Sequence, residues 1–562
     1  MNRFRNLIEA LDAAPADRPF VTAWIDEDES ETVTFGEFRK RARFQAGILR
    51  DHGVTCGDRV IVIMPQGIPA MTAFVGAMML GAVPAFLAYP NFKVEPSKYR
   101  SGLAGVTANL SAKVVVIDEG FPDEMLSYVS LNDRSKLLRA RGGQTPRTGV
   151  ELPQLDYPSE TLAFIQHSAG TTGLQKGVAL NHAAVLRQLE HLAQALKIDT
   201  AIDRVYNWLP LYHDMGLIAC FMLPMVCHLP VVMQSPLDWV MHPETMLQII
   251  TEHKCTLAWM PNFAFQFVPR RTSEESKSAY DLSSLRALIN CSEPVQSKSM
   301  DEFYRAFASQ GLRREALQSS YAMAENVFAV TQSGRKGPLK IFADRQHFSS
   351  QHLIKEVAAD AMGSISFTSS GRLMPQNDAR IVSEAGETLS PRRVGEILVK
   401  SDSLFEGYYN RSDLTALSMV DGWYRTGDLG FFHEEELFVV GRQKDVLIVA
   451  GENIYPQDVE DIVCGHPSIH DGRAVAIGLF DPDSGTEDLV VVAEVEQREF
   501  LEHKAQIERE IRGSIFSQIG VAVRSLLLKP PGWIVKSTAG KPARSTTREK
   551  LLREHPNLPL PD

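Results

Sequence analysis

The sequence lacks several features that would assign a chain of 562 residues to a familiar class. Its six cysteines are scattered along the length without a C-x-x-C pair, which argues against a disulfide framework and a zinc knuckle. Positive charge is not in excess, because 69 acidic residues face 58 basic ones and the net charge is −11. This balance argues against a dedicated nucleic-acid binder, so we expect no nucleic-acid partner.

Long apolar runs are also scarce. The most apolar window, residues 70–90, is interrupted by Gly76, Gly81 and Pro84, so we expect a buried helix followed by a buried strand and no membrane span. The first residues mix charged and apolar side chains and do not resemble a secretory signal. The sequence therefore predicts a cytoplasmic protein.

The composition that remains is that of a large globular protein. Hydrophobic residues make up 44% of the chain and charged residues 23%, as in soluble proteins generally. At about 150 residues per domain, the length indicates more than one lobe. Residues 34–117 alternate helical stretches with short apolar runs, and residues 235–292 and 315–371 repeat this mix. Such alternation is typical of an α/β fold with parallel strands.

The C-terminal part has a different pattern. Two apolar runs, residues 436–440 and 446–450, flank a polar turn and predict paired strands. Isoleucines recur every four positions from Ile507 to Ile519 and predict a helix. We expect a body over residues 1–441 and a separate, small α+β domain over residues 442–562.

Residues 164–177 are the most informative stretch: Phe-Ile-Gln-His-Ser-Ala-Gly-Thr-Thr-Gly-Leu-Gln-Lys-Gly. An apolar strand leads into glycines, which let backbone N–H groups approach a ligand closely. Hydroxyl side chains and Lys176 add donors and a positive charge. The stretch predicts a polyphosphate-binding loop, with a plain turn as the alternative, although the spacing G-x-x-x-x-G-K-S/T does not fit it.

Five motifs, in order along the chain, resemble those of the adenylate-forming superfamily, which includes acyl-CoA synthetases, luciferase and nonribosomal-peptide adenylation domains. They are residues 168–177, 321–325, 423–430, 441–445 and 537–541. The resemblance implies a large body of two α/β lobes plus a β-barrel-like part, followed by a small mobile α+β domain that carries the catalytic lysine.

Within that superfamily, residues 208–217, 261–264 and 290–294 resemble the fatty acyl-AMP ligases most closely. The 44 positions from Glu325 to Ser369 fall where those enzymes carry an extra segment associated with poor use of free coenzyme A. The sequence departs from the superfamily pattern at Ala322, where glycine is usual, and in a final motif without the common proline. These departures concern substrate preference more than the chemistry.

The resemblance implies an ATP-dependent ligase that converts a carboxylic acid to acyl-AMP and releases pyrophosphate. We expect the acid to be a fatty acid. The acyl group would then pass to the phosphopantetheine thiol of a holo acyl carrier protein in trans, because the short C-terminal tail leaves no room for a carrier domain. The expected context is polyketide, nonribosomal peptide, other secondary metabolite or lipid biosynthesis. The alternatives are a carboxylate–CoA ligase and a catalytically silent nucleotide-binding scaffold.

The reaction brings a carboxylate to the α-phosphorus of ATP, so catalysis consists mainly of positioning and charge neutralisation. By resemblance, Lys541 is the catalytic cation and Glu325 is a ligand of Mg²⁺, the expected cofactor beside ATP. His213 lines the carboxylate pocket. Each has a plainer alternative: a solvated lysine, a surface glutamate and a core histidine.

The resemblance also assigns the nucleotide contacts. Asp428 accepts hydrogen bonds from the ribose hydroxyls, Tyr321 offers a flat face to adenine, and Arg442 contacts ribose or phosphate. Lys444 occupies the hinge position. The remaining expected contacts are Ser168, Ala169, Gly170, Thr171, Thr172, Gly173 and Lys176 at the phosphates, with Ser292, Glu293, Pro294, Ala322 and Met323 beside the base. The alternatives are a core tyrosine, a turn aspartate and an exposed hairpin.

Overall fold

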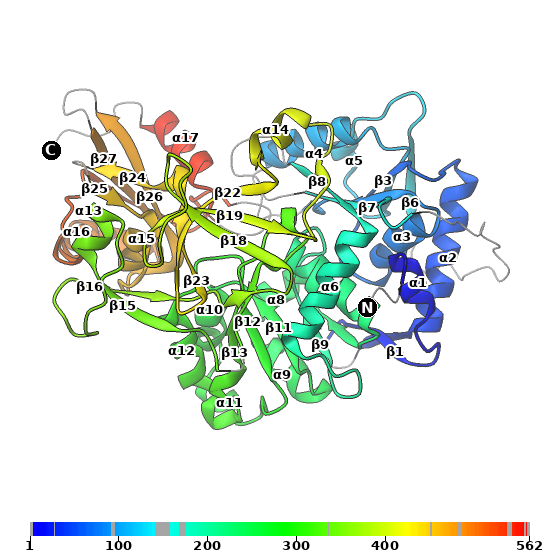
Figure 1. The fold of residues 1–562 in the computed structure, drawn as a ribbon, viewed down its shortest axis with the longest axis horizontal. Coiled ribbons are helices and arrows are strands. Elements are labelled where there is room, and N and C mark those ends of the chain that lie inside the picture. The colour runs from blue at the N-terminus through cyan, green and yellow to red at the C-terminus, as the bar shows by residue number, and fades with distance from the viewer. Residues whose placement is uncertain are drawn as a thin grey trace.

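The computed structural model describes residues 4–26, 29–90, 96–140, 158–167, 176–334, 336–449, 452–481, 486–536, 542–555 and 558. Helices and strands are mixed along the chain, so the predicted α/β class is confirmed. Figure 1 shows the N-terminal elements at one end of the molecule and the last, orange and red, elements at the other.

A seven-stranded sheet forms the centre of the body, in the order β13-β12-β11-β9-β10-β1-β2. Its strands are β1 (Pro19–Trp24), β2 (Ser30–Thr34), β9 (Val205–Asn207), β10 (Val231–Met233), β11 (Leu257–Met260), β12 (Ala287–Asn290) and β13 (Leu317–Ser319). Neighbouring strands are parallel except for β2, which is antiparallel to β1. Parallel strands place their carboxyl ends at one edge, where α/β sheets bind ligands.

Helices connect these strands, as parallel pairing requires. They are α6 (His182–Leu196), η1 (Met215–Met222), α7 (Leu223–Cys227), α8 (Pro236–Met241), α9 (Thr245–His253), α10 (Ala264–Arg271), α11 (Glu274–Lys277), α12 (Ser297–Phe307), η2 (Ala308–Gln310) and η3 (Arg314–Ala316). The N-terminal α1 (Leu7–Asp12) packs against α7. Most of their apolar residues belong to one large buried cluster with the sheet.

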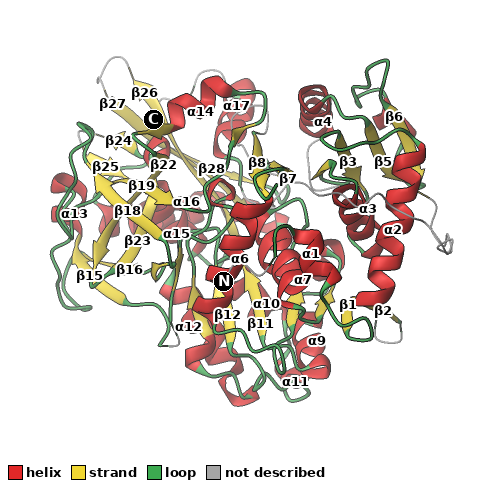
Figure 2. Ribbon diagram, turned by 45° about the vertical axis from the view of Figure 1, so that its right-hand side comes forward, coloured by secondary structure: helices red, strands yellow, loops and turns green. Residues whose placement is uncertain are grey.

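A second, four-stranded parallel sheet has the order β4-β3-β5-β6. Its strands are β3 (Arg59–Ile63), β4 (Val83–Phe86), β5 (Val114–Asp118) and β6 (Lys136–Ala140), and its helices are α2 (Phe35–Asp51), α3 (Ile68–Met79), α4 (Pro96–Leu110) and α5 (Asp123–Leu126). Figure 2 shows this layer beside the central sheet. The predicted helix and strand within residues 70–90 are confirmed as α3 and β4, both buried.

Two antiparallel sheets complete the body. The small one joins β7 (Leu162–His167), β8 (Gly177–Asn181) and β20 (Gly407–Tyr408), and the large one has the order β14-β17-β23-β22-β19-β18, with β21 beside β22. The strands of the large sheet are β14 (Thr331–Gln332), β17 (Arg372–Leu373), β18 (Asn377–Val382), β19 (Gly395–Ser401), β21 (Met419–Val420), β22 (Trp423–His433) and β23 (Glu436–Arg442). Two short helical elements also belong to this part of the chain: η4 (Ala324–Asn326) precedes β14, and α14 (Ser412–Ser418) lies between β20 and β21 in sequence. Over the described residues this is an open path, so the β-barrel-like part is a sheet and not a closed barrel.

The long spacing after Glu325 contains a compact unit. β15 (Lys340–Asp344) pairs antiparallel with β16 (Ser364–Thr368), and α13 (Arg345–Gln351) follows β15 directly. Phe348 of α13 stacks on Tyr455, with ring centroids 4.9 Å apart, and His352 and Asn453 are hydrogen-bonded at 2.9 Å. The extra segment therefore contacts the C-terminal part of the chain.

The C-terminal part has its own apolar clusters. A three-stranded sheet of β26 (Ile469–Asp481), β27 (Thr486–Val495) and β28 (Ser525–Lys529) packs with α15 (Pro456–Cys464), η6 (Arg498–His503), α16 (Lys504–Ile519) and α17 (Arg544–Glu554). The predicted helix is confirmed as α16, where Ile507, Ile511 and Ile515 are buried. Separate packing agrees with the expected domain division, which stays a prediction.

The predicted pairing across the polar turn is wrong. β23 pairs with β22 and β17, whereas β24 (Leu447–Val449) pairs with β25 (Glu452–Ile454). The single-turn helix η5 (Gln443–Asp445) separates β23 and β24. Apolar patterning identifies strands but does not choose their partners. Among the described residues, no helix combines the length and apolarity needed to cross a bilayer.

Candidate active site

The predicted site residues gather at the carboxyl edge of the central sheet. Tyr321 follows β13, Ser292 follows β12, and His213 lies six residues beyond β9. These three strands run parallel in the central sheet. The Ser320 amide donates to the Asn290 carbonyl at 3.0 Å, so the exits of β12 and β13 are adjacent. The segments that carry these residues therefore lie side by side along one edge of the sheet.

Tyr321 and Asp428 form a buried pair. The Tyr321 hydroxyl donates to Asp428 Oδ2 at 2.5 Å, and Arg442 Nε lies 3.2 Å from Asp428 Oδ1. Burial raises the pKa of Asp428, while Arg442 and the Tyr321 hydroxyl act in the opposite direction. Tyr321 follows β13, whereas Asp428 and Arg442 lie on β22 and β23, so the predicted adenine and ribose residues are brought together.

The backbone around Asp428 is also held in place. Its amide donates to Thr426 Oγ1 at 3.0 Å, and the Thr426 hydroxyl donates to the Ile397 carbonyl at 2.7 Å. Asp428 opposes Arg442 in the pairing of β22 with β23. The carboxylate and the guanidinium are therefore presented by neighbouring strands. Such pairing through the backbone fixes the direction in which both side chains point.

Glu325 lies in a second polar group with two tyrosines. The Tyr408 hydroxyl donates to Glu325 Oε1 at 2.7 Å, and the hydroxyls of Tyr408 and Tyr424 are 3.1 Å apart. Burial and the Glu325 charge raise the pKa of both tyrosines well above the usual value. Both phenols therefore stay protonated and can donate to the carboxylate.

Two lysines approach this group. Lys176 Nζ lies 4.5 Å from the centre of the Tyr408 ring, so Lys176, which belongs to the predicted phosphate loop, contacts the tyrosine that donates to Glu325. Desolvation and the positive charge of Arg442 lower the pKa of Lys444, and Lys176 contributes in the same direction. The site thus combines a carboxylate with several cations, a suitable environment for a polyphosphate.

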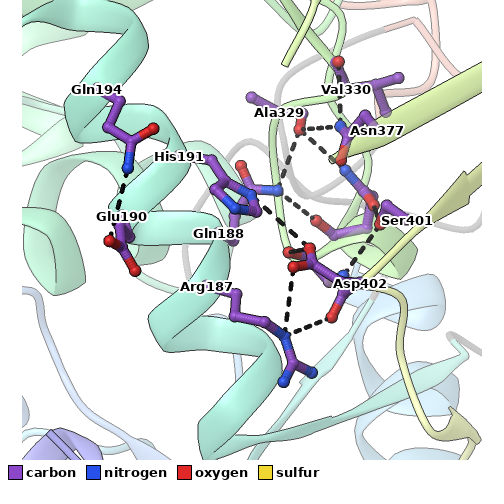
Figure 3. A network of polar contacts seen from close by, with 12 residues as sticks. Arg187, Gln188, Glu190, His191, Gln194, Ala329, Val330, Asn377, Ser401 and Asp402 are labelled. Atoms are coloured by element: carbon purple, nitrogen blue, oxygen red, sulfur yellow. Dashed lines mark hydrogen bonds and ion pairs between the residues drawn. The ribbon is translucent and has the colours of Figure 1, made fainter. Parts of the chain in front are cut away.

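The segment that carries Glu325 is fixed by a network of buried amides. Gln188 of α6 donates to the carbonyls of Asn326 and Ala329 at 3.1 Å each, and Asn377 donates to the Ala329 and Val330 carbonyls. Figure 3 shows the Gln188 amide pointing from α6 toward the Ala329 carbonyl. Gln188 and Asn326 are fully buried. Because buried carbonyls need donors, this network determines the path of the backbone that follows Glu325.

The backbone of the same segment is strained. Val327 has φ +61°, a left-handed conformation that β-branched residues rarely adopt. Strain of this kind persists where the surroundings over-determine the conformation, and it is common at ligand sites. Ser401 adds a hydrogen bond from its hydroxyl to Asn326 Oδ1, so α6, β18 and β19 together hold this loop.

His213 lies next to the predicted base contacts. Its Nδ1 is 2.7 Å from Asp214 Oδ1, and Ser292 Oγ is 3.9 Å from Met215 Sδ, two residues further along the chain. Ser292 has φ +72°. Glu293 accepts a hydrogen bond from the Phe263 amide at 3.1 Å. Ser292 and Glu293 thereby join the loops that follow β9, β11 and β12.

Several predicted residues have no role that the described contacts identify. Pro294 continues the loop after Glu293. Ala322 forms an isolated bridge with Ala329, and the Met323 amide donates to the Phe328 carbonyl at 2.9 Å, so both shape the turn that contains Glu325. The predicted residues Ser168, Ala169, Gly170, Thr171, Thr172, Gly173 and Lys541 lie outside the described part of the chain.

Sequence reasoning missed Tyr408, Tyr424 and Gln188. Tyr424 lies within the motif 423–430 but received no role there, and no motif position or periodicity distinguishes Tyr408 or Gln188, because aromatic residues are common in strands and glutamine is common in helices. Their contacts join positions far apart in sequence: Tyr408 is 83 residues from Glu325, and Gln188 is 138 residues from Asn326.

The residues present fit a hard divalent cation held mostly by a nucleotide. Glu325 offers carboxylate oxygens, which Mg²⁺ prefers, and Mg²⁺ commonly takes one or two carboxylates together with phosphates and water. Over the described residues, no group of three or more His, Cys, Asp or Glu side chains could hold a metal alone. A metal at Glu325 would thus depend on bound phosphate.

Comparison with known proteins agrees with this geometry. A family model described as AMP-binding enzyme matches residues 9–409. The chain is 31% identical to the 4-hydroxyphenylalkanoate adenylyltransferase of Mycobacterium marinum, over 93% of this chain and 86% of that protein. This similarity extends over most of both proteins.

Solved structures agree as well. A structure from a study of fatty acyl-adenylate ligases from E. coli and L. pneumophila superposes with a TM-score of 0.90 at 25% identity, over 99% of both chains. A fatty acyl-adenylate ligase from L. pneumophila in complex with acyl adenylate and pyrophosphate has a TM-score of 0.73 at 26% identity, over 98% of this chain and 96% of that one.

Proposed function

This chain belongs to the AMP-binding enzyme family, and from that premise we propose that it activates an acid with an apolar chain and passes the acyl group to a carrier protein's thiol. It is an adenylate-forming ligase with fatty acyl-AMP ligases among its relatives. The observation that carries the proposal is that the buried Tyr321 and Asp428 meet the more exposed Arg442 in one polar group. This group has the donors, acceptor and aromatic face that a nucleoside needs.

In the first half-reaction, ATP binds at the carboxyl edge of the central sheet. Adenine lies beside Tyr321 and residues 292–294, and the ribose hydroxyls donate to Asp428. The Asp428 oxygens already accept from Tyr321 and face Arg442. Burial raises the pKa of Asp428, and these two partners oppose this effect by favouring the ionised carboxylate, the form that acts as an acceptor. The phosphates extend toward Lys176 and Glu325.

Charge neutralisation then permits attack by the acid. The two reacting groups are both anionic, so cations placed at the phosphates lower the barrier. Lys541 supplies a positive charge at the α-phosphate and the attacking carboxylate. Glu325, together with the nucleotide, would hold Mg²⁺, which would supply Lewis-acid stabilisation of the phosphate charge. His213 lines the carboxylate pocket, with its ring oriented by Asp214.

The acid's tail is proposed to be apolar. Trp208 and Trp239 stack with ring centroids 3.5 Å apart, and Phe263 packs edge-on against both. Trp208 follows β9 and Phe263 follows β11, the strands that lead to the His213 loop and the Glu293 contact. These rings support either an aliphatic or an aryl-terminated chain.

The second half-reaction transfers the acyl group from the adenylate, a reactive mixed anhydride, to a phosphopantetheine thiol. Support for a protein-bound thiol comes from the segment over residues 340–368, which stands where fatty acyl-AMP ligases carry their extra segment. This segment contacts the C-terminal region through Phe348 and Tyr455. The carrier's place in polyketide, nonribosomal peptide or lipid biosynthesis belongs to the same proposal.

A direct experiment compares acceptors. The protein is incubated with ATP, Mg²⁺ and a panel of aliphatic and aryl-terminated acids, and then with holo acyl carrier protein, its apo form or free coenzyme A. We expect acylation of the holo carrier alone, measured by intact-protein mass spectrometry, because the apo form lacks the thiol. Efficient acyl-CoA formation without carrier acylation would make the chain a carboxylate–CoA ligase instead.

A further inference from the structure

The geometry points to Tyr408 as a positioning residue: we propose that its hydroxyl holds the Glu325 carboxylate, and its ring holds Lys176, in the arrangement that binds metal–ATP. The inference rests on the proposed function, because it takes Glu325 as the ligand of the ATP-bound metal. Tyr408 itself touches neither acid nor nucleotide in this account. It acts through the two charged side chains beside it.

The two contacts use different parts of the same side chain. The hydroxyl donates to Glu325 Oε1 at 2.7 Å, which directs that carboxylate without neutralising it. The face of the ring lies 4.5 Å from Lys176 Nζ, within the range of cation–π attraction. One buried tyrosine therefore places an anion and a cation close together, and the distance between them depends on the tyrosine.

The backbone of Tyr408 explains why it can do this. β20 is only two residues long and pairs antiparallel with β8, with Tyr408 opposite Val178. The next residue, Tyr409, donates its amide to the Gly177 carbonyl at 2.7 Å. The position of Tyr408 is thus fixed to the strand that leaves the predicted phosphate loop.

A second tyrosine extends the contact to the ribose side of the site. The Tyr424 hydroxyl lies 3.1 Å from that of Tyr408, and Tyr424 is four residues before Asp428 on β22. Three elements meet at Tyr408: the strand after the phosphate loop, the loop of Glu325, and the strand of Asp428. Hydrogen-bonded partners of a metal-binding carboxylate fix its orientation and tune its affinity.

Packing alone does not account for this arrangement. A tyrosine that only fills space needs no partner for its hydroxyl beyond a carbonyl or water. The Tyr408 phenol is instead buried beside a carboxylate and a second phenol, and the three groups form a chain of polar contacts. The neighbouring Tyr409 differs, because its ring packs against the apolar cluster of the four-stranded sheet.

The test uses Tyr408→Phe, which removes the hydroxyl and keeps the ring. We expect the Mg²⁺ concentration for half-maximal pyrophosphate exchange to rise by about tenfold or more, as for other partners of metal ligands, with a smaller change in the KM for the acid. Mn²⁺ binding in the presence of a nonhydrolysable ATP analogue, followed by electron paramagnetic resonance, should weaken by a similar factor. This second readout does not depend on turnover.

Three further variants separate positioning from packing. Tyr409→Phe, the matched control, should leave the Mg²⁺ dependence unchanged. Tyr424→Phe should shift it less than Tyr408→Phe, and adding it to Tyr408→Phe should change little more, because Tyr424 acts through the same hydroxyl. Tyr408→Leu removes the ring as well and should also raise the KM for ATP, since Lys176 loses its partner.

The outcomes distinguish the inference from the proposed function. If the wild-type protein shows no carboxylate-dependent pyrophosphate exchange with any acid, the proposed function fails and the inference fails with it. If the wild type is active, Glu325→Gln is inactive and Tyr408→Phe keeps the wild-type dependence on Mg²⁺ and Mn²⁺, only the positioning role is overturned. A lowered melting temperature with unchanged metal dependence would likewise make Tyr408 a packing residue.

Discussion

The polar group around Glu325 and Asp428 and the contacts made by the C-terminal region are built in different ways. In the first, buried tyrosines donate directly to carboxylates. In the second, the buried stack of Phe348 on Tyr455 is accompanied by ion pairs: Arg270 pairs with Asp471 at 3.0 Å while its side chain is 50% exposed, and the partly buried Arg345 lies 3.7 Å from Asp458. Buried, shared hydrogen bonds hold one geometry, whereas exposed ion pairs contribute little to stability.

This difference suits a site in which the polar group around Glu325 and Asp428 stays fixed while the C-terminal region can move away from it. The proposed nucleotide contacts belong to residues before η5, whereas the predicted catalytic lysine lies near the C-terminal end of the sequence. Described residues on either side of 537–541 pair across the gap, since Lys536 forms a bridge with Pro542. We propose that the C-terminal region moves relative to the body during the two half-reactions, with Lys444 at the hinge.

The largest expected effect comes from the C-terminal region. Lys541→Ala should lower the rate of acyl-adenylate formation by about a hundredfold or more, as removal of a group that stabilises transition-state charge generally does. Stability should change little. Single-turnover measurement of adenylate by mass spectrometry checks the rate, and Lys536→Ala serves as a nearby control. A near-normal rate in Lys541→Ala would remove this lysine from the mechanism.

The next effect tests the fixed part. Gln188→Ala should lower the free energy of unfolding by about 2 kcal/mol, because the buried Asn326 carbonyl loses its side-chain donor and the Ala329 carbonyl loses one of its donors. On the same helix, the exposed Gln194 makes only a 3.5 Å contact with Glu190, so Gln194→Ala should stay within about 0.5 kcal/mol. Figure 3 shows both glutamines. Chemical denaturation measures the difference, and equal effects would contradict the proposed role of the network.

A smaller effect concerns pH and buried histidine. Burial lowers the pKa of His182 to about 4, so the folded state binds fewer protons than the unfolded state between about pH 4 and 6.5. Stability should therefore fall as pH is lowered through this window, by at most about 1.4 kcal/mol per pH unit for this group. His182→Gln should flatten the dependence, whereas His242→Gln, at a side chain 67% exposed, should not. Denaturation at pH 4.5, 5.5 and 6.5 measures both slopes.

The smallest effect belongs to the exposed contacts. Arg270→Ala should lower stability by less than about 1 kcal/mol, since exposed ion pairs are weak, and adenylate formation should keep its rate. Thermal unfolding and pyrophosphate exchange test these expectations. If Arg270→Ala lost as much stability as Gln188→Ala, the two regions would be held equally firmly, which would contradict the difference between them.

Much of the architecture could be predicted from sequence. Apolar alternation identified β3, β4, β5 and α16, because periodicity reports which face of an element is buried. The resemblance placed Tyr321 and Asp428 in one site, and the structure brings them to 2.5 Å. Local patterns and ordered motifs were sufficient for these features.

Features that depend on distant partners could not be predicted. The partner of β23 is chosen by sheet packing, and an open path of strands cannot be distinguished from a closed barrel by strand count. Tyr408 and Gln188 acquire their roles only when the chain brings them to Glu325 and Asn326. A side chain's polar partner is a tertiary property, and a single sequence does not record it.

The central claim is that residues held together around Glu325 and Asp428 bind ATP for attack by a carboxylate. Radiolabelled pyrophosphate exchange into ATP, with and without acid, tests it most directly when wild type, Glu325→Gln and Asp428→Asn are compared. The account predicts acid-dependent exchange in the wild type and its loss, or a strongly raised requirement for ATP or Mg²⁺, in both variants. Wild-type rates and requirements in both variants would contradict it.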